Sequence, residues 1–447
     1  MKIPQRPPET QTLLHAAGEA IVDALIAGNP LDDKGRYLHW DDMRHRTPPS
    51  GLTRETWWLA TVFSRTAIAK KLPLLDTDGR PFRFSNVDIV QERVHRIDQQ
   101  ASGQILADDV VTDLRSTDRY LVSSLIEEAI TSSQLEGAST TRRVAKDMLA
   151  TGRLPRDRDE RMITNNFQAM AFAQGLADRE LTPADVLDLH RIVTEGTLDD
   201  PSEAGRLQTP DDERITVVSN DDTVLHEPPP AEQLADRLDA MCRFANGEST
   251  PGFIHPVVRA VILHFWLAYD HPFADGNGRT ARALFYWSML RDRYWLAPYL
   301  SVSSILRKAP AQYARSYLLT ETDYNDVTYF VVYQLQVIER AIKSLHDYLA
   351  RKATETSEVE ALVHGSPTLN PRQVAVLGKA LRTPGGNLTI TAHMKLHRIV
   401  YETARTDLIQ LEELGLLTRT RAGKKFVFRA QPDLSRRLRT MGQDLSS

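Results

Sequence analysis

The run His-Pro-Phe-Ala-Asp-Gly-Asn-Gly-Arg-Thr-Ala-Arg at residues 271–282 concentrates the residue types that phosphate chemistry requires. It lies between two segments with helical apolar spacing, 257–269 and 280–290, so it should form a loop that opens a helix. A helix start exposes unpaired N–H groups and the positive end of the helix dipole, and both favour an anion. Gly276 and Gly278 lack a Cβ, so phosphate oxygens can approach that backbone closely. The run therefore predicts a phosphate-binding loop.

The other side chains of the run fit such a loop. Asp275 offers the hard oxygen ligand that Mg²⁺ takes beside nucleotide phosphates, and Asn277 can donate an amide N–H to a phosphate. Arg279 and Arg282 share a helix face, where two guanidinium groups can bind the outer phosphates. His271 precedes the loop, and its neutral imidazole can accept a proton from an incoming hydroxyl. A lone histidine beside proline is more often a packing residue, but its neighbours here favour the catalytic interpretation.

The run resembles the signature of the Fic (filamentation induced by cAMP) family, His-Pro-Phe-x-Asp/Glu-Gly-Asn-Gly-Arg-x-x-Arg, and every specified position is present. The resemblance implies an all-helical fold that transfers AMP from ATP onto a protein hydroxyl and releases pyrophosphate. It implies His271 as general base and Asp275 as the ligand of Mg²⁺, or of Mn²⁺ in its place. The residues that it implies for binding the ATP phosphates are Gly276, Asn277, Gly278, Arg279 and Arg282.

A second motif precedes this run in the chain. Residues 119–137 carry an apolar stripe at helical spacing, and Gly137 is a plausible helix stop. Glu136 would then lie at the negative end of the helix dipole, where a carboxylate is unfavourable unless a cation pairs with it. Without such a partner Glu136 would be a solvated surface residue. Ser132-x-x-x-Glu136-Gly137 resembles the inhibitory motif of the Fic class with an N-terminal inhibitory helix. That resemblance implies that Glu136 pairs with Arg282, so that ATP binds unproductively.

The bulk composition is that of a soluble globular protein. Of 447 residues, 26% are charged and 41% are hydrophobic, and the formal net charge is -4. Cys242 is the single cysteine, which excludes an intrachain disulfide and favours a reducing compartment. No apolar run approaches the length that spans a bilayer, and residues 1–10 do not resemble a signal peptide. We therefore expect a cytoplasmic protein without a membrane partner.

The positions of helix caps, turn residues and changes in composition along the chain predict a mainly α fold in four parts. These are an N-terminal extension at 1–115, an inhibitory helix with lead-in helices at 116–180, a catalytic Fic core at 181–350 and a winged-helix domain at 366–447. The core should begin at the N-cap Thr182, followed by Pro183.

A short β-hairpin is expected within the helical core, between residues 214 and 230. Its first strand would contain the β-formers Ile215, Val217 and Val218, and residues 220–222 would form the turn. A lone hairpin in a helical domain can be surface decoration. The Fic resemblance implies instead a flap over the active site, where a target segment is held by strand pairing.

The C-terminal segment differs in charge from the rest. Residues 366–447 contain 14 Lys and Arg against 6 Asp and Glu, a net charge of +8, whereas the preceding residues carry -12. The segment predicts a helix from Asn370 to Leu381, a short helix opened by Thr389, a helix over 403–414 and two strands around Arg421–Gly423. This pattern is typical of a winged helix-turn-helix. Its basic charge favours DNA slightly over a protein-interaction or dimer module.

Three hypotheses of function follow. The first is an autoinhibited, Mg²⁺-dependent protein adenylyltransferase that modifies a target protein or itself. The second is a de-AMPylating hydrolase that uses the same site with Glu136. The third is a DNA-binding transcriptional regulator whose Fic core senses nucleotide. A homodimer is compatible with each, and the identity of the target protein is left open.

Overall fold

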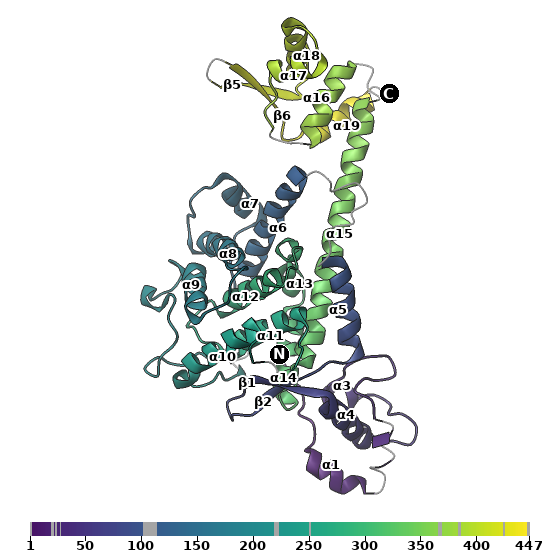
Figure 1. Ribbon diagram of the computed structural model, residues 1–447, viewed down its shortest axis with the longest axis vertical. Coiled ribbons are helices and arrows are strands. Elements are labelled where there is room, and N and C mark those ends of the chain that lie inside the picture. Colours follow the sequence, from purple (N-terminus) through teal and green to yellow (C-terminus); the bar gives the residue numbers. More distant parts are fainter. Residues whose placement is uncertain are drawn as a thin grey trace. The chain divides into compact units, whose positions relative to one another are not determined.

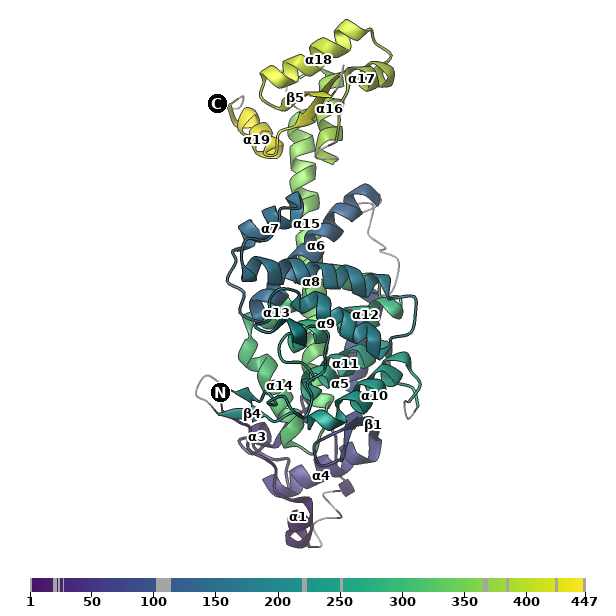
Figure 2. The same cartoon turned by 90° about the vertical axis from the view of Figure 1, so that its left-hand side faces the viewer.

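A computed structural model describes residues 2–444 except 19–21, 23, 24, 27, 102–113, 219–222, 250, 251, 365–368, 383–385, 423 and 424. Helices dominate this part of the chain, and each of its sheets is a two-stranded hairpin (Figures 1 and 2). The mainly α prediction is thus confirmed. The chain divides into two compact units, residues 1–105 with 121–343 and residues 106–120 with 344–447. None of the described helices is long and apolar enough to cross a membrane.

Two buried helices form the centre of the first unit, α11 (Pro256–Asp270) and α12 (Asn277–Arg291). Nearly all their side chains are buried, so each helix needs neighbours on every side rather than on one face. Part of that cover comes from α8 (Arg158–Gly175), α9 (Pro183–Thr194) and α10 (Leu234–Asn246) (Figure 1). The predicted phosphate loop connects α11 to α12 and is therefore anchored at both ends in the core.

The remaining helices of this unit complete the helical layer. They are α1 (Thr10–Ala17), α3 (Trp40–Met43), α4 (Arg54–Ile68), α5 (Asp88–Ala101), α6 (Leu114–Leu135, in this unit from Leu121), α7 (Arg142–Thr151), α13 (Val302–Lys308), α14 (Pro310–Thr322) and the part of α15 (Thr328–His364) up to Lys343. The helix expected at Thr182 and Pro183 is present: Thr182 caps α9 by accepting from the Asp185 N–H at 3.3 Å, and Pro183 is the first helical residue.

Two hairpins belong to the first unit. β1 (Ala69–Leu75) pairs with β2 (Pro81–Ser85), and β3 (Val217–Val218) pairs with β4 (Val224–His226). The second is the predicted flap hairpin, and its turn at 220–222 lies outside the described residues. Ile215 was expected in the first strand but precedes it.

The reason for that late start is the side chain of Arg214. Its guanidinium donates to the carbonyl oxygens of Pro229, Asp270 and His271, at 3.0, 2.9 and 3.0 Å. These bonds hold the chain before β3 against the end of α11, so strand pairing starts only at Val217.

The second unit has the order of elements that its sequence predicts. α16 (Pro371–Arg382), α17 (Ile390–His397) and α18 (Tyr401–Glu413) precede β5 (Leu417–Ala422) and β6 (Lys425–Ala430), which pair antiparallel, and α19 (Leu434–Asp444) follows. Leu377, Leu408 and Phe428 are among the residues of its own buried core. The tip of the hairpin at 423–424 and the predicted domain start at 366–367 lie outside the described residues. The winged helix-turn-helix assignment itself stays a prediction.

Candidate active site

The loop between α11 and α12 reverses the chain within six residues, 271–276. His271 closes α11 in the left-handed region at φ 44°, and Gly276 enters α12 at φ 84°. A side chain at Gly276 would be strained by that φ, and its Cβ would lie 2.7 Å from Thr194 Cγ2. The first N–H groups of α12 have no partner within the helix, because its first intrahelical bond is donated by Thr280 to Gly276. The loop therefore leads into a helix start with unpaired N–H groups, as the sequence predicts, and anion binding there stays a prediction.

His190, a residue of α9, contacts this loop through a hydrogen bond and a ring stack. The sequence predicts only that His190 lies on a helix, not that it contacts the loop. His190 Nε2 lies 2.8 Å from the carbonyl oxygen of Asp275, and its Nδ1 accepts from the Gly205 N–H at 3.0 Å. Its ring stacks on Phe273 with centroids 3.7 Å apart. Burial lowers the pKa of His190 to about 4, so the ring is neutral at pH 7 with its proton on Nε2.

The imidazole of His271 is neutral at pH 7. Burial, and after it the charge of His226, lowers the pKa of His271 to about 4. Its Nδ1 lies 3.4 Å from the carbonyl oxygen of Ala268, which favours a proton on Nδ1 and leaves the lone pair on Nε2. A neutral imidazole with this tautomer can accept a proton from a hydroxyl.

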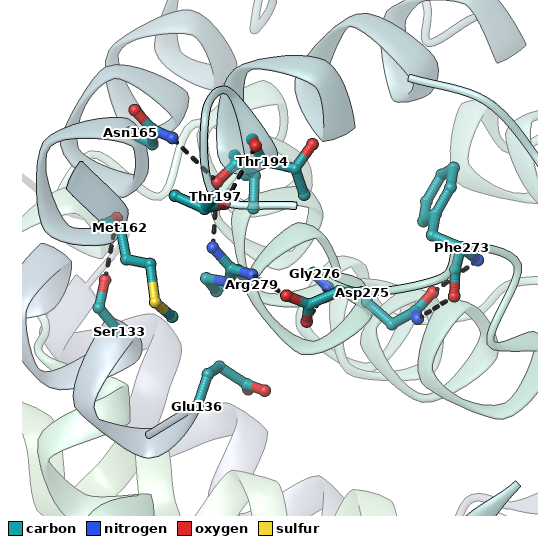
Figure 3. A network of polar contacts seen from close by, with 12 residues as sticks. Ser133, Glu136, Met162, Asn165, Thr194, Thr197, Phe273, Asp275, Gly276 and Arg279 are labelled. Carbon is teal, nitrogen blue, oxygen red and sulfur yellow. Dashed lines mark hydrogen bonds and ion pairs between the residues drawn. The ribbon is translucent and has the colours of Figure 1, made fainter. Parts of the chain in front are cut away.

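Arg279 and Asp275 lie together at the start of α12. Arg279 is fully buried and donates to the carbonyl oxygen of Val193 at 3.0 Å and to Asp275 Oδ2 at 3.2 Å (Figure 3). The exposed guanidinium of Arg158 lies 3.9 Å from the same carboxylate oxygen. The loop thus combines a buried cation, an accessible carboxylate and backbone donors at a helix start.

The inhibitory motif and Arg282 are brought together from distant parts of the chain. Arg282 Nε donates to Ser132 Oγ at 2.8 Å, and its Nη2 donates to Glu136 Oε1 at 2.8 Å and to the Ser132 carbonyl oxygen at 3.1 Å. The guanidinium is almost fully buried, and Glu136 follows the last residue of α6. Gly137, at φ 98°, ends the helix turn as expected. Arg282 is therefore held by α6 in this state.

Glu136 also occupies the approach to the loop backbone. A Cβ placed on Gly278 would lie 2.9 Å from Glu136 Cδ and 3.1 Å from Arg282 Nη1. In Figure 3 Glu136 extends from the end of α6 into the space beside Arg279 and Asp275. Its carboxylate therefore lies beside the backbone of Gly278 as well as against Arg282.

The side chain of Asn277 makes its hydrogen bonds within the loop itself. Its Nδ2 donates to the Phe273 carbonyl oxygen at 2.7 Å, and its Oδ1 accepts from the Phe273 N–H at 3.0 Å. The side chain is buried, so a phosphate contact in this state would come from its backbone N–H. The expected contact of the Asn277 side chain with a phosphate stays a prediction.

Another carboxyl group near Arg282, that of Glu128 on α6, is not part of the Ser132–Gly137 motif and was not predicted from the sequence. Glu128 is fully buried, two helical turns before Glu136, and accepts from the Ser303 N–H at 3.1 Å and from Ser301 Oγ at 3.2 Å. Burial raises the pKa of Glu128 to about 7, and the bonds from Ser303 and the charge of Arg282 offset this only in part. Its four-residue spacing from Ser132 on one helix face could have pointed to it.

A metal ion at this site would take most of its ligands from a bound nucleotide rather than from the protein. Among the described residues, no three His, Cys, Asp or Glu side chains are grouped closely enough to hold a metal ion. The Asp275 carboxylate is 45% exposed and stands at the start of α12. One accessible carboxylate suits Mg²⁺ that is bound mainly by nucleotide phosphates and water.

Comparison with known proteins agrees with this geometry. Residues 180–289 match the model of the Fic/DOC family. The chain is 34% identical over 202 residues to protein adenylyltransferase fic-1 of Caenorhabditis elegans, an alignment that covers 45% of this chain and 34% of that protein. It is 31% identical over 170 residues to protein adenylyltransferase Fic of Nematostella vectensis, which covers 38% and 34%. The chain thus spans about a third of the length of these curated relatives.

The fold has a counterpart among solved structures. A crystal structure of a Fic family protein from Desulfovibrio desulfuricans aligns with a TM-score of 0.50 and 22% identity, and the alignment covers 78% of this chain and 97% of that one. The likeness extends well beyond residues 180–289, so the helices around the loop also follow that fold.

Proposed function

Because residues 180–289 form a Fic/DOC family domain, we propose that the chain is an autoinhibited protein adenylyltransferase. It would transfer AMP from ATP to a hydroxyl side chain of a target protein, or of itself, and release pyrophosphate. One observation carries the autoinhibited form of the proposal: the Glu136 carboxylate lies against both Arg282 and the backbone of Gly278. A phosphate would need the same donors.

The residues of the loop account for the transfer step. The target hydroxyl oxygen attacks the α-phosphorus of ATP while the bond from that phosphorus to the bridging oxygen of the β-phosphate breaks. His271 Nε2 accepts the hydroxyl proton, and pyrophosphate leaves with the bonding electrons. The N–H groups at the start of α12 and the Arg279 guanidinium stabilise charge on the phosphates.

Mg²⁺ would supply charge neutralisation on the phosphates and would be held by Asp275. This residue has a second role that needs no metal, since its carboxylate accepts from Arg279 and fixes that guanidinium beside the loop. Either role predicts that Asp275→Ala impairs nucleotide binding.

Inhibition follows from competition for Arg282. The guanidinium already has acceptors on Ser132 and Glu136, so a turn toward an outer phosphate would break its hydrogen bonds to the buried Ser132 hydroxyl and to the partly exposed Glu136 carboxylate. Charge-assisted hydrogen bonds of this kind contribute about 1.5–3 kcal/mol each. ATP would then bind with its triphosphate displaced and its α-phosphorus out of line with the attacking hydroxyl.

The test is incorporation of label from α-labelled ATP into protein in a cell lysate. Glu136→Gly should raise labelling about 10- to 100-fold, the factor that corresponds to removal of one charge-assisted bond. Glu136→Gln keeps the length of the side chain but removes its charge, so it should activate less. The double variant Glu136→Gly/His271→Ala is the inactive control. Labelling of Glu136→Gly at the wild-type level, with normal ATP affinity, would refute the inhibitory role.

A de-AMPylating hydrolase is the second candidate for the same site. The observation that favours it is the position of Glu136, whose charge acts on His271 as well as on Arg282. A carboxylate there could orient a water molecule toward the phosphorus of a modified side chain. Loss of AMP from a pre-modified target that disappears in Glu136→Gly would support this activity.

The C-terminal unit supports a separate proposal of DNA binding. Residues 366–447 carry a net charge of +8, and Arg405, Arg421 and Arg429 are exposed on α18, β5 and β6. A helix followed by a basic hairpin can contact DNA phosphates with the hairpin while the helix enters a groove. The third hypothesis, a regulator with a nucleotide-sensing core, requires that DNA binding respond to ATP and survive His271→Ala. The buried free Cys242 is compatible with the reducing cytoplasm that we propose as its location.

A further inference from the structure

The imidazole of His226, the last residue of β4, has a hydrogen-bond acceptor at each ring nitrogen. Its Nε2 lies 2.6 Å from the carbonyl oxygen of Tyr269, and its Nδ1 lies 2.8 Å from Glu321 Oε2. A neutral imidazole carries one N–H and can donate only once. A ring that faces a carbonyl oxygen and a carboxylate is satisfied at both positions only as the doubly protonated imidazolium.

The surroundings of this ring favour the positive charge. The backbone carbonyls at the C-terminal end of α11, where Tyr269 lies, form the negative end of the helix dipole. Glu321 comes from α14, and its carboxylate is the direct ion-pair partner. The other titratable or charged groups around the ring are Tyr269, Asp270 with its partner Arg237 from α10, Arg214 before β3, and His271.

We propose that His226, as an imidazolium paired with Glu321, is a positioning residue that fastens the β3–β4 hairpin to α11 and α14 beside His271. The proposal rests on the adenylyl transfer proposed above, since it assigns the hairpin a fixed place next to the base of that reaction. His226 reaches Tyr269, two residues before His271, so displacement of the ring would move both the hairpin and the segment that carries the base.

The same charge acts on His271 through space. After burial, the charge of His226 is the next largest cause that lowers the pKa of His271. A cation beside the base disfavours its protonation, so His271 stays neutral and able to accept a proton. Removal of the His226 charge should therefore raise the pKa of His271.

The pairing of His226 with Glu321 makes the attachment of the β3–β4 hairpin depend on pH. Burial disfavours the charge of His226, but the hydrogen bond and charge of Glu321 outweigh burial, so the pKa of His226 lies above its ordinary 6.5. The contribution of this group to the folded hairpin is complete below pH 6.5 and is lost as the pH rises through the raised pKa. The hairpin is thus held below pH 6.5 as long as Glu321 is ionised, and this contribution is lost as the pH rises through the raised pKa of His226.

The experiment titrates the histidine side chains of the whole chain by NMR with isotope-labelled histidine. Thirteen histidines are present, and His226→Gln and His271→Gln assign the two resonances of interest. The expected result is a His226 ring that titrates above 6.5 with both nitrogens protonated below that point. In Glu321→Gln, which keeps an oxygen acceptor without the charge, the His226 titration should move to lower pH. In His226→Gln the His271 titration should move to higher pH.

Kinetics in the Glu136→Gly background provide the second readout. His226→Gln and Glu321→Gln should both lower kcat, by up to about 100-fold for a base displaced by an ångström, and should remove the alkaline limb of the pH profile. The matched control is His255→Gln, which removes a histidine–carboxylate pair with Asp98 at the opposite end of α11 and should leave the profile unchanged. Glu321→Gln guards against a folding defect at position 226.

A His226 that titrates at or below 6.5, or a His271 titration that is the same in His226→Gln as in the wild type, would overturn the proposal. The NMR measurements need no transfer activity. Inactivity of Glu136→Gly itself would therefore count against the adenylyltransferase function, and the result on His226 would still be interpreted independently.

Discussion

At the scale of single residues, Gly278 is the position where the proposed inhibition and the proposed substrate binding would meet. A Cβ at this residue would lie 2.9 Å from Glu136 Cδ, and in the proposed function a phosphate oxygen would approach the same backbone. The proposed restrained and productive states would then differ in which anion lies there. A methyl group at this residue should exclude both.

Gly278→Ala should consequently not activate the wild-type chain, although it displaces Glu136. In the Glu136→Gly background it should lower ATP affinity about tenfold or more, because crowding of this order costs about 1–3 kcal/mol. Isothermal titration with ATP and magnesium measures the change. Gly175→Ala is the matched control, since a Cβ there meets nothing within 4 Å. Unchanged ATP affinity in the Gly278→Ala double variant would contradict the assigned binding position.

Substitution of Ser132 should raise labelling less than substitution of Glu136 does. Ser132→Ala removes the acceptor of Arg282 Nε but leaves the Ser132 carbonyl and Glu136 in place. We expect labelling to rise a few-fold, as for one hydrogen bond of about 1 kcal/mol. Ser133→Ala is the control, because that hydroxyl donates to the carbonyl oxygens of Ala129 and Met162 instead. Equal labelling of the two variants would show that the Ser132 hydroxyl does not hold Arg282.

At the scale of elements, Glu128 and Ser132 lie on α6 and Glu136 directly follows its last residue, so the three stand at four-residue intervals along the chain. The last two hold Arg282, whereas Glu128 holds the start of α13 through Ser303. The end of α6 is thus held by a buried carboxyl at one point and by the Glu136–Arg282 ion pair just after the helix. Stability of the first contact should depend on pH.

The raised pKa of Glu128 predicts the direction of that dependence. A carboxyl with an ordinary value of 4.5 that is raised to about 7 on folding stabilises the protein fully below pH 4.5, and this contribution is lost as the pH rises through 7. Relative to Glu128→Gln, the wild-type free energy of unfolding should fall by about 2–3 kcal/mol between pH 5 and pH 8. Urea unfolding at the two pH values measures it.

Glu127→Gln is the neighbouring control, since Glu127 faces Arg142 and Lys146 near the surface. It should show no comparable difference between the two pH values. A wild-type chain whose free energy of unfolding changes with pH as that of Glu128→Gln does would mean that Glu128 is ionised without cost.

At the scale of the whole molecule, charge is divided unevenly along the chain. Residues 366–447 carry +8 and the preceding residues carry -12. A basic domain attached to an acidic catalytic region should attract polyanions through the former alone. The proposed partner of that domain can therefore be tested in the intact chain.

We expect the full chain to bind duplex DNA with an affinity that falls linearly on a log–log plot against salt. Replacement of Arg405 and Arg421 by alanine should reduce the slope by about one for each DNA phosphate that is no longer neutralised. Fluorescence anisotropy over a salt series measures the slope. Arg142→Ala with Arg143→Ala, on α7 of the first unit, is the charge-matched control. Identical slopes for both pairs of variants would exclude α18 and β5 as the DNA-contacting surface.

Local patterns determined much of this protein from its sequence. The phosphate loop is recognisable because the residues that build it are neighbours in the chain, and Gly276 and Gly278 are required by backbone geometry that lies within the same turn. The start of α9 at Thr182 and Pro183 was predictable for the same reason, since capping bonds connect residues three apart. The β3–β4 hairpin was also expected, although its strand starts after Ile215.

Only the tertiary structure decided which distant side chains meet. Arg282 and Glu136 are 146 residues apart and became visible in the sequence only through a resemblance, while His226 and Glu321, 95 residues apart, had no sequence signal at all. Asn277 turned inward to Phe273 because a buried amide must find partners wherever the loop provides them. Helix and turn signals act over a few residues, whereas the pairing of a buried charge depends on where the packed helices bring its partner. The sequence therefore specified the loop, and the packing of the helices around it specified the ion pairs Glu136–Arg282 and His226–Glu321.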